Sequence, residues 1–198
     1  MNKFYSFLIL FSITFGFVGC TKQPILKIYT LDTPTTKKVA TSQHKTKTFK
    51  VMYPQSLKSA ISSKILFSYS LNEQGSYENA QWSNSIAKLL EGTFIQTLEQ
   101  SKMFKAVIAY TSTANEDYRL ESNIFELSHQ VRGNDSHSVV SIQFSLVHAR
   151  KSVLIATKRF SYIVPTKTTN AKGYVDATNE AIHKMNSDLV EWIKGVRF

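Results

Sequence analysis

Cysteine is almost absent from this chain, because Cys20 is the only one among its 198 residues. With one thiol the chain cannot form an internal disulfide bond, and it lacks the thiolate sets that hold structural zinc. The sequence also lacks a Gly-rich phosphate loop, a nucleophile-elbow motif and a His-Glu-x-x-His pair. We therefore expect a fold that depends on its apolar core, and no motif points to a catalytic reaction.

The five histidines do not have the spacing of metal ligands. They are His44, His129, His137, His148 and His183. Each is expected to be an ordinary surface or sheet residue. We predict no catalytic residue, no metal site and no other cofactor.

The N-terminal segment has the layout of a secretory signal. Residues 1–3 supply a positive charge, residues 4–18 are almost wholly apolar, and Gly19 stands before Cys20. A charged start, an apolar middle and a small residue at the cut are typical of a signal peptide. The apolar run breaks at Thr21, so it is shorter than the ~20 residues that a membrane-spanning helix needs. Because the only cysteine stands at the cut, the segment resembles a bacterial lipoprotein signal.

That resemblance implies cleavage before Cys20, a diacylglyceryl thioether on its sulfur and a further acyl chain, such as palmitate, on its new amino group. Several acyl chains give stable membrane anchoring where a single chain does not. One position departs from the usual pattern, since Phe17 stands where leucine is common. Thr21 follows the cysteine in place of aspartate, which by resemblance implies sorting to the outer membrane, with the protein facing the periplasm.

The formal net charge of the chain is +10. A basic surface attracts anionic partners. For a lipoprotein of the envelope these are phospholipid headgroups, lipopolysaccharide or an acidic protein patch, and nucleic acid is not expected. The alternative is a solvated basic surface that only aids solubility, because the charges form no long block.

The sequence divides into three parts. Residues 1–19 are the predicted signal peptide, residues 20–48 a lipidated N-terminus with a short strand and a linker, and residues 49–198 a single α+β domain. Apolar residues at helical spacing predict two amphipathic helices, at residues 82–101 and about 172–194. Alternation predicts strands at residues 25–31, 49–53, 65–71, 104–110, 118–131, 139–148 and 153–164. We expect a mostly antiparallel sheet with both helices packed on one face.

One hairpin can be registered in advance. A two-residue turn at residues 134–135 would place His129 opposite Val140. The same register forms two apolar cross-strand pairs, Leu127 with Ile142 and Phe125 with Phe144. The apolar phase of the first strand changes near Ile124, which predicts a β-bulge there.

Several short motifs occur in a specific order. Residues 77–82 read Tyr-Glu-Asn-Ala-Gln-Trp before the first helix, and residues 104–107 read Phe-Lys-Ala-Val after it. Residues 117–120 read Asp-Tyr-Arg-Leu, and the closing helix contains Trp-Ile at residues 192–193. Together these motifs resemble the ABC-type transport auxiliary lipoproteins, the family that includes the PqiC-like partners of MCE-domain lipid transporters.

The family resemblance implies a non-catalytic lipoprotein that assists an inner-membrane ABC permease and ATPase and their MCE-domain protein in moving phospholipid. It implies attachment to the outer membrane through the lipid anchor and leaves open whether the chain forms a homo-oligomer. Tyr77 and Trp82 are candidate partner contacts, because aromatic residues often anchor interfaces. Trp82 has a second interpretation, in which it covers the start of the first helix within the core.

Two other functions remain open at this point. The first is an outer-membrane assembly or lipopolysaccharide-handling lipoprotein, which would also explain the basic charge. The second is a secreted hydrolase whose site the sequence does not reveal.

We predict that Cys20→Ala abolishes acylation, because only the cysteine sulfur can form the thioether. The protein should then accumulate as an uncleaved precursor, which mass spectrometry of the intact chain detects. Normal maturation of this variant would refute the lipoprotein interpretation.

Overall fold

The structure is a computed structural model that describes residues 24–33, 35, 38–39, 42, 44–56, 62–70 and 72–197. The predicted signal peptide and Cys20 lie outside these residues. Within the described part of the chain, no helix is both long enough and apolar enough to cross a membrane.

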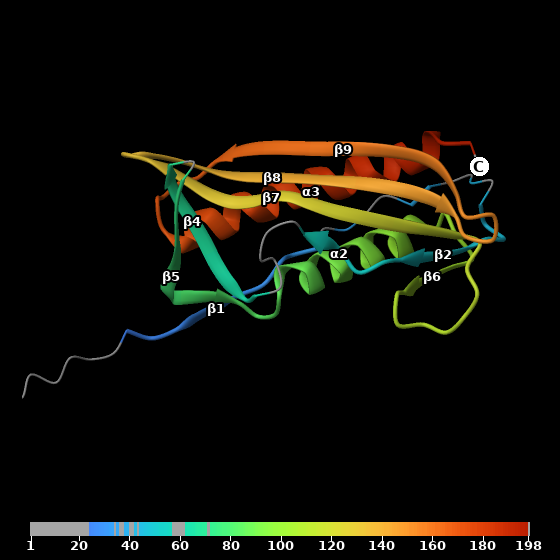
Figure 1. Cartoon of the computed structure of the whole chain (residues 1–198), viewed down its shortest axis with the longest axis horizontal. Coiled ribbons are helices and arrows are strands. Elements are labelled where there is room, and N and C mark those ends of the chain that lie inside the picture. Colours follow the sequence, from blue (N-terminus) through green and yellow to red (C-terminus); the bar gives the residue numbers. More distant parts are fainter. Residues whose placement is uncertain are drawn as a thin grey trace, which may run out of the picture.

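One sheet and two helices make up the body of the molecule (Figure 1). The elements are β1 (Lys27–Tyr29), β2 (Thr48–Val51), β3 (Gln55–Ser56), β4 (Lys64–Ser70), β5 (Glu73–Trp82), α2 (Ile86–Ser101), β6 (Ala106–Ala109), β7 (Tyr118–Arg132), β8 (Asp135–His148), β9 (Val153–Pro165) and α3 (Ala171–Gly195). The long pairings β7–β8, β8–β9 and β4–β5 are antiparallel. The short pairings that β1, β2 and β3 make are parallel, as is that of β4 with β7. The predicted α+β class is confirmed.

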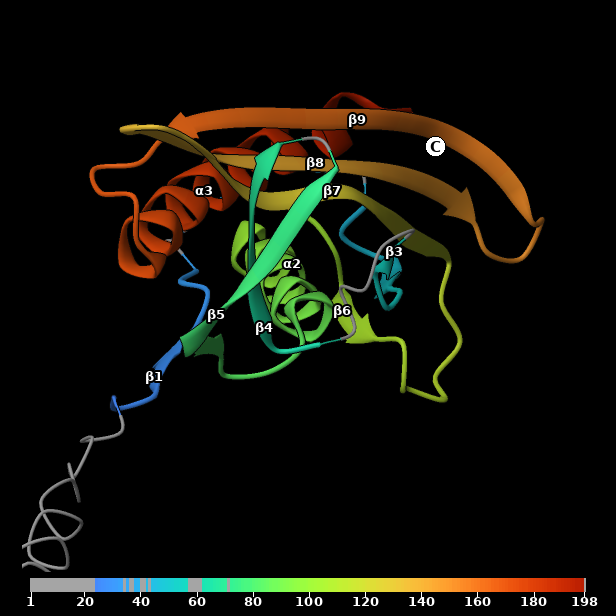
Figure 2. The same cartoon turned by 60° about the vertical axis from the view of Figure 1, so that its left-hand side comes forward.

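Both helices cover the same face of the long strands (Figure 2). Phe94 of α2 meets Phe144 of β8 edge to face, with ring centroids 5.1 Å apart. Thr178 of α3 shares a 2.8 Å hydrogen bond between side-chain hydroxyls with Ser138 of the same strand. Ser138 and Phe144 differ by an even number of positions along the strand, so their side chains point to the same face of β8. The predicted placement of the helices is therefore confirmed.

The β7–β8 turn differs from the predicted one. Arg132 pairs with Asp135, so the turn consists of Gly133 and Asn134 instead of residues 134–135. Gly133 has a φ of 59°, which glycine adopts without a Cβ clash and which tight hairpin turns require. Asp135 therefore belongs to β8 and not to the turn.

The shifted turn also changes the cross-strand pairs. The observed pairs are Leu127 with Val140, Ile124 with Ile142, and Ser122 with Phe144. His129 accordingly lies opposite Ser138, and the predicted pairs of Leu127 and Phe125 are wrong. The bulge predicted near Ile124 is confirmed, because the register shifts between Ile124 and Glu126.

Helix α2 begins later than predicted. Trp82 is the last residue of β5, and the helix starts at Ile86. The Ser85 side chain caps it by accepting a 3.3 Å hydrogen bond from the backbone N–H of Lys88. The apolar stripe that followed Trp82 was correctly assigned to a helix, but the cap fixes the start four residues on.

We predict that Phe94→Ala lowers the free energy of unfolding by ~3–5 kcal/mol, because the ring of Phe94 is fully buried against Phe144 and its removal leaves a cavity. Denaturant unfolding monitored by circular dichroism measures the loss. Gln96→Ala is the matched control, since Gln96 is exposed on the same helix and should change stability by no more than ~0.5 kcal/mol. Equal effects of the two substitutions would show that α2 does not bury this face.

Candidate functional site

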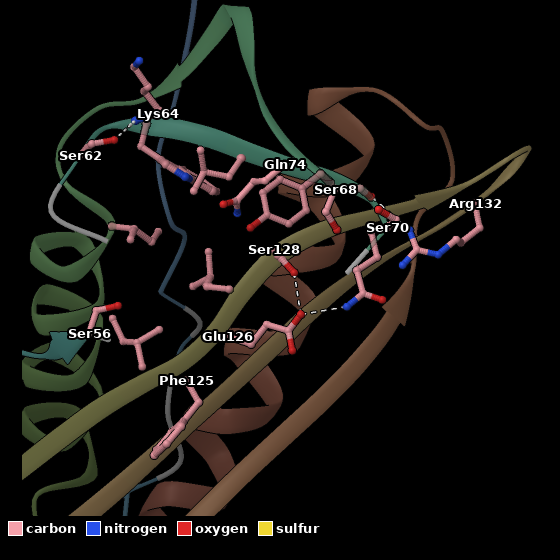
Figure 3. A pocket seen from close by; sticks show the side chains of 17 residues that line it. Ser56, Ser62, Lys64, Ser68, Ser70, Gln74, Phe125, Glu126, Ser128 and Arg132 are labelled. Carbon is pink, nitrogen blue, oxygen red and sulfur yellow. Dashed lines mark hydrogen bonds between the residues drawn. The ribbon is translucent and has the colours of Figure 1, made fainter. Parts of the chain in front are cut away.

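A cleft lies where β4 separates from β7 (Figure 3). The two strands pair at Phe67 with His129 and at Ser68 with Gln130. From there β4 diverges toward Lys64, while β3 meets β7 farther along, at Asn123 and Ile124. The space between them measures about 260 Å³. The non-parallel course of β4 is thus what opens the cleft.

The floor of the cleft is apolar and its walls are polar. The floor residues come from five elements and are Leu66, Trp82, Ile86, Ile124, Leu127 and Tyr174. The wall contains many hydroxyl groups, from Ser56, Ser62, Ser68, Ser70 and Ser128. Lys64 and Arg132 supply positive charge and Glu126 the negative charge. The cleft thus surrounds an apolar floor with polar and charged groups.

The polar wall groups bind one another. Glu126 Oε1 accepts hydrogen bonds from Ser128 Oγ at 2.9 Å and from Gln130 Nε2 at 2.8 Å. Arg132 donates to the backbone carbonyl of Ser68 at 3.3 Å and to its neighbour Val131 at 3.0 Å. The Glu126 carboxylate is therefore held by neutral donors and has no basic partner among these contacts.

This arrangement does not assemble a nucleophile with a histidine base. Ser128 touches Glu126, but the adjacent His129 points to the opposite face of β7, as alternation along a strand requires. Elsewhere His183 Nε2 lies 3.6 Å from Asp32 Oδ2, yet nearby Ser187 donates to the backbone carbonyl of His183 instead of to its ring. Among the described residues, no three His, Cys, Asp or Glu side chains are grouped so as to hold a metal ion.

Behind the cleft, three aromatic rings are stacked across β5, β7 and α3. The His129 imidazole lies between Tyr77 and Tyr174, at ring-centroid distances of 6.1 and 5.2 Å and interplanar angles of 22° and 16°. Tyr77 Oη is 2.7 Å from His129 Nδ1 and donates to the backbone carbonyl of Thr169 at 3.3 Å. Trp82 meets Tyr174 edge to face at 6.1 Å. The stack therefore connects the sheet to the start of α3.

Burial keeps this stack uncharged. His129 is 0% exposed, and burial lowers the pKa of its imidazole to about 4. Burial, with a smaller contribution from Tyr69, raises the pKa of the Tyr77 hydroxyl to about 12. His129 Nε2 has no hydrogen-bond partner in the part of the chain that the structure describes. Both rings are consequently neutral at pH 7, and the stack is a structural connection.

The two candidate partner contacts, Tyr77 and Trp82, lie in different environments. Trp82 is 2% exposed, so its indole forms part of the core and the packing interpretation is favoured over direct contact with a partner. Tyr77 is partly exposed, but its hydroxyl points inward to His129. The cleft and the stack around His129 were not predicted, because the cleft depends on β4 lying beside β7 and the stack on residues of β5 and α3 that are far from His129 in the chain.

A family model described as "ABC-type transport auxiliary lipoprotein component" matches residues 29–190. Among solved structures, protein XCC0632 from Xanthomonas campestris is 20% identical, with a TM-score of 0.76 over 85% of this chain and 95% of that chain. A second, titled only as an uncharacterized protein, is 12% identical, with a TM-score of 0.66 over 85% and 99% of the two chains. At these identities the two structures show a shared fold. No curated protein sequence matches the chain.

We predict that His129 makes folding stability depend on pH. The unfolded imidazole binds a proton below its ordinary pKa of 6.5, whereas the folded one stays neutral down to about 4. Stability is therefore fully present above pH 6.5 and is lost as the pH falls toward 4, by on the order of 3 kcal/mol in total. His129→Phe keeps a ring in the stack and removes this dependence.

Urea unfolding of wild type and His129→Phe between pH 7 and pH 4.5 measures the difference in slope. Tyr77→Phe is the matched control, because it removes the hydroxyl but leaves the imidazole buried, and it should retain the wild-type slope. If wild type and His129→Phe lose the same stability over this range, the imidazole is not buried in its neutral form.

Proposed function

The chain belongs to the ABC-type transport auxiliary lipoprotein family, and we propose that it serves as a non-catalytic accessory of an ABC/MCE-type system that moves phospholipid through the bacterial envelope. The observation that carries this proposal is the extent of the family match. It begins at Tyr29 in β1 and ends at Val190 in α3, so it includes the sheet, both helices and the cleft. The whole body of the molecule, and not one motif, is therefore of the family type.

The proposed location is the periplasmic face of the outer membrane, through acylated Cys20. It is supported by the signal-like segment at residues 1–19 and by Thr21 after the cysteine. The proposed partners are an MCE-domain protein and the ABC permease and ATPase that drive it. A lipid-anchored body whose cleft groups are occupied by one another suits a component that acts by contact.

A lipopolysaccharide-handling role is the second candidate, and the positive charge of the chain is the observation that favours it. Lys64 and Arg132 at the cleft are the basic groups nearest to an apolar floor, as a lipid phosphate would need. However, Arg132 already donates to two backbone carbonyls. The cleft therefore gives this alternative less support than the family match gives the first.

We predict that the tagged, acylated protein recovers an MCE-domain protein and an ABC permease or ATPase from detergent-solubilised envelopes, because the folded body makes the contact. Mass spectrometry of the recovered proteins identifies them. The matched control carries residues 1–24 of this chain fused to an unrelated periplasmic domain, and it should recover none of them.

Two outcomes would contradict the proposal. Equal recovery by the control would assign the interaction to the anchor. Recovery of no transporter component, together with turnover of a lipid or glycan substrate by the purified protein, would favour the hydrolase alternative.

A further inference from the structure

Basic side chains gather at one end of the molecule because several loops of the chain meet there. β2, β6 and β7 all begin at this end, since Thr48 pairs with Ala106 and Phe49 with Tyr118. The β8–β9 turn lies there too, because Tyr118 pairs with His148. The loops that meet at this end carry the basic residues Lys38, Lys45, Lys47, Lys102, Lys105, Arg150 and Lys151, which we call the basic pole.

Contacts between these loops show that the basic pole is one surface. Asp117 Oδ1 lies 3.3 Å from Arg150 Nη2 and 3.8 Å from Lys47 Nζ, so it joins two of the loops. The backbone N–H of Lys105 donates to the carbonyl of Lys47 at 2.9 Å, and that of Val39 donates to Ser101 at 2.8 Å. Residues far apart in the sequence are thereby held side by side.

Two carboxylates at this end, those of Asp117 and Glu116, point inward, whereas Glu99 in the last turn of α2 is exposed. Asp117 accepts from the backbone N–H of Thr48 in addition to its two ion pairs, and its side chain is 17% exposed. Glu116 is 12% exposed and is bound by Lys50 at 2.7 Å and Arg119 at 3.2 Å. By contrast, the side chain of Arg150 is 73% exposed. The basic pole therefore presents mainly positive charge to the solvent, while Asp117 and Glu116 are bound inside.

Apolar side chains stand beside this charge. Val153 and Leu154, which follow the β8–β9 turn, are 53% and 57% exposed. Cations next to exposed aliphatic groups form the mixture that protein interfaces use, with apolar contact at the centre and charge around it.

The basic pole lies at the opposite end of the molecule from β1 (Figure 1). The described chain begins at Pro24, four residues after Cys20, and four extended residues span at most roughly 14 Å. Ile25 and Ile28, 85% and 62% exposed, surround this starting point and suit contact with a lipid surface. An anchor on Cys20 would thus hold the β1 end at the bilayer and direct the basic pole away from it.

We propose that the basic pole docks on an acidic surface of the protein partner in the transport complex. The bilayer that holds the anchor is at the other end of the molecule. The anionic surface that the basic pole meets is therefore that of a protein in the aqueous space. Opposite charges steer such an encounter and make it sensitive to salt. The proposal depends on the proposed function for the identity of the partner.

The test uses the acylated full-length protein in nanodiscs and the periplasmic part of an MCE-domain protein from the same organism, with surface plasmon resonance at 50 and 300 mM NaCl. Lys105 and Lys151 are exposed and form no ion pair with the residues that the structure describes, so Lys105→Glu/Lys151→Glu changes the basic pole without breaking its internal ion pairs. This variant should bind at least about tenfold more weakly at low salt and should lose the salt dependence of the wild type.

Lys27→Glu/Lys167→Glu is the matched control, because it makes the same change of charge at exposed positions near the other end of the molecule and outside the cleft. It should bind within about twofold of wild type. A third variant, Leu154→Ser, should dissociate faster with the salt dependence unchanged, because it removes apolar contact and no charge.

The outcomes separate this proposal from the proposed function. If wild type binds and Lys105→Glu/Lys151→Glu binds equally well, or the control weakens binding as much, the basic pole is not the docking surface and the accessory function stands. If wild type does not bind the MCE-domain protein, both fail. Loss of binding to phosphatidylglycerol vesicles by the pole variant, with unchanged binding to the protein, would assign the basic pole to a membrane.

Discussion

The bulge at Phe125 in β7 is the constraint on which the rest of the structure depends. Before it, Leu120 and Ile124 face the helices, and after it His129 does, although alternation alone would put these residues in opposite phases. Without the extra residue, Glu126 would turn into the core and His129 toward solvent, because a one-residue slip exchanges the faces of a strand. The bulge therefore creates both the aromatic stack on one face and the polar cleft wall on the other.

Sequence reasoning found the elements that have a local signal. The two helical stripes, the long strands and the change of phase near Ile124 are all visible in a short window of residues. The predicted register of the β7–β8 hairpin was wrong because residues 133–134 and residues 134–135 both suit a two-residue turn. The positive φ of Gly133 in the structure shows which of the two turns forms. The cleft and the stack had no local signal at all, because they arise from β4 and α3 meeting β7 across long stretches of chain.

The interior of the molecule is built to carry little charge. His129 is kept neutral by burial, and the Tyr77 hydroxyl is kept protonated by the same cause. Glu91 is the exception on α2, and Lys88 binds its Oε2 at 2.7 Å from the surface. A core of this kind gains its stability mainly from packing.

The cleft and the basic pole are the two surfaces that a partner could use, and they differ in how many of their charged groups already bind a neighbour. In the cleft, Glu126 is held by Ser128 and Gln130, so a ligand there would have to compete with hydrogen bonds already made. At the β8–β9 end, Asp117 and Glu116 are held inside while Lys105 and Lys151 are exposed, so an acidic partner would gain ion pairs and break few. Breaking the hydrogen bonds of a polar group that already has partners costs more free energy than forming an ion pair with an exposed side chain. Docking at the basic pole is therefore energetically easier than docking in the cleft. The fold thus places this charged surface at the end of the molecule that lies away from β1 (Figure 1).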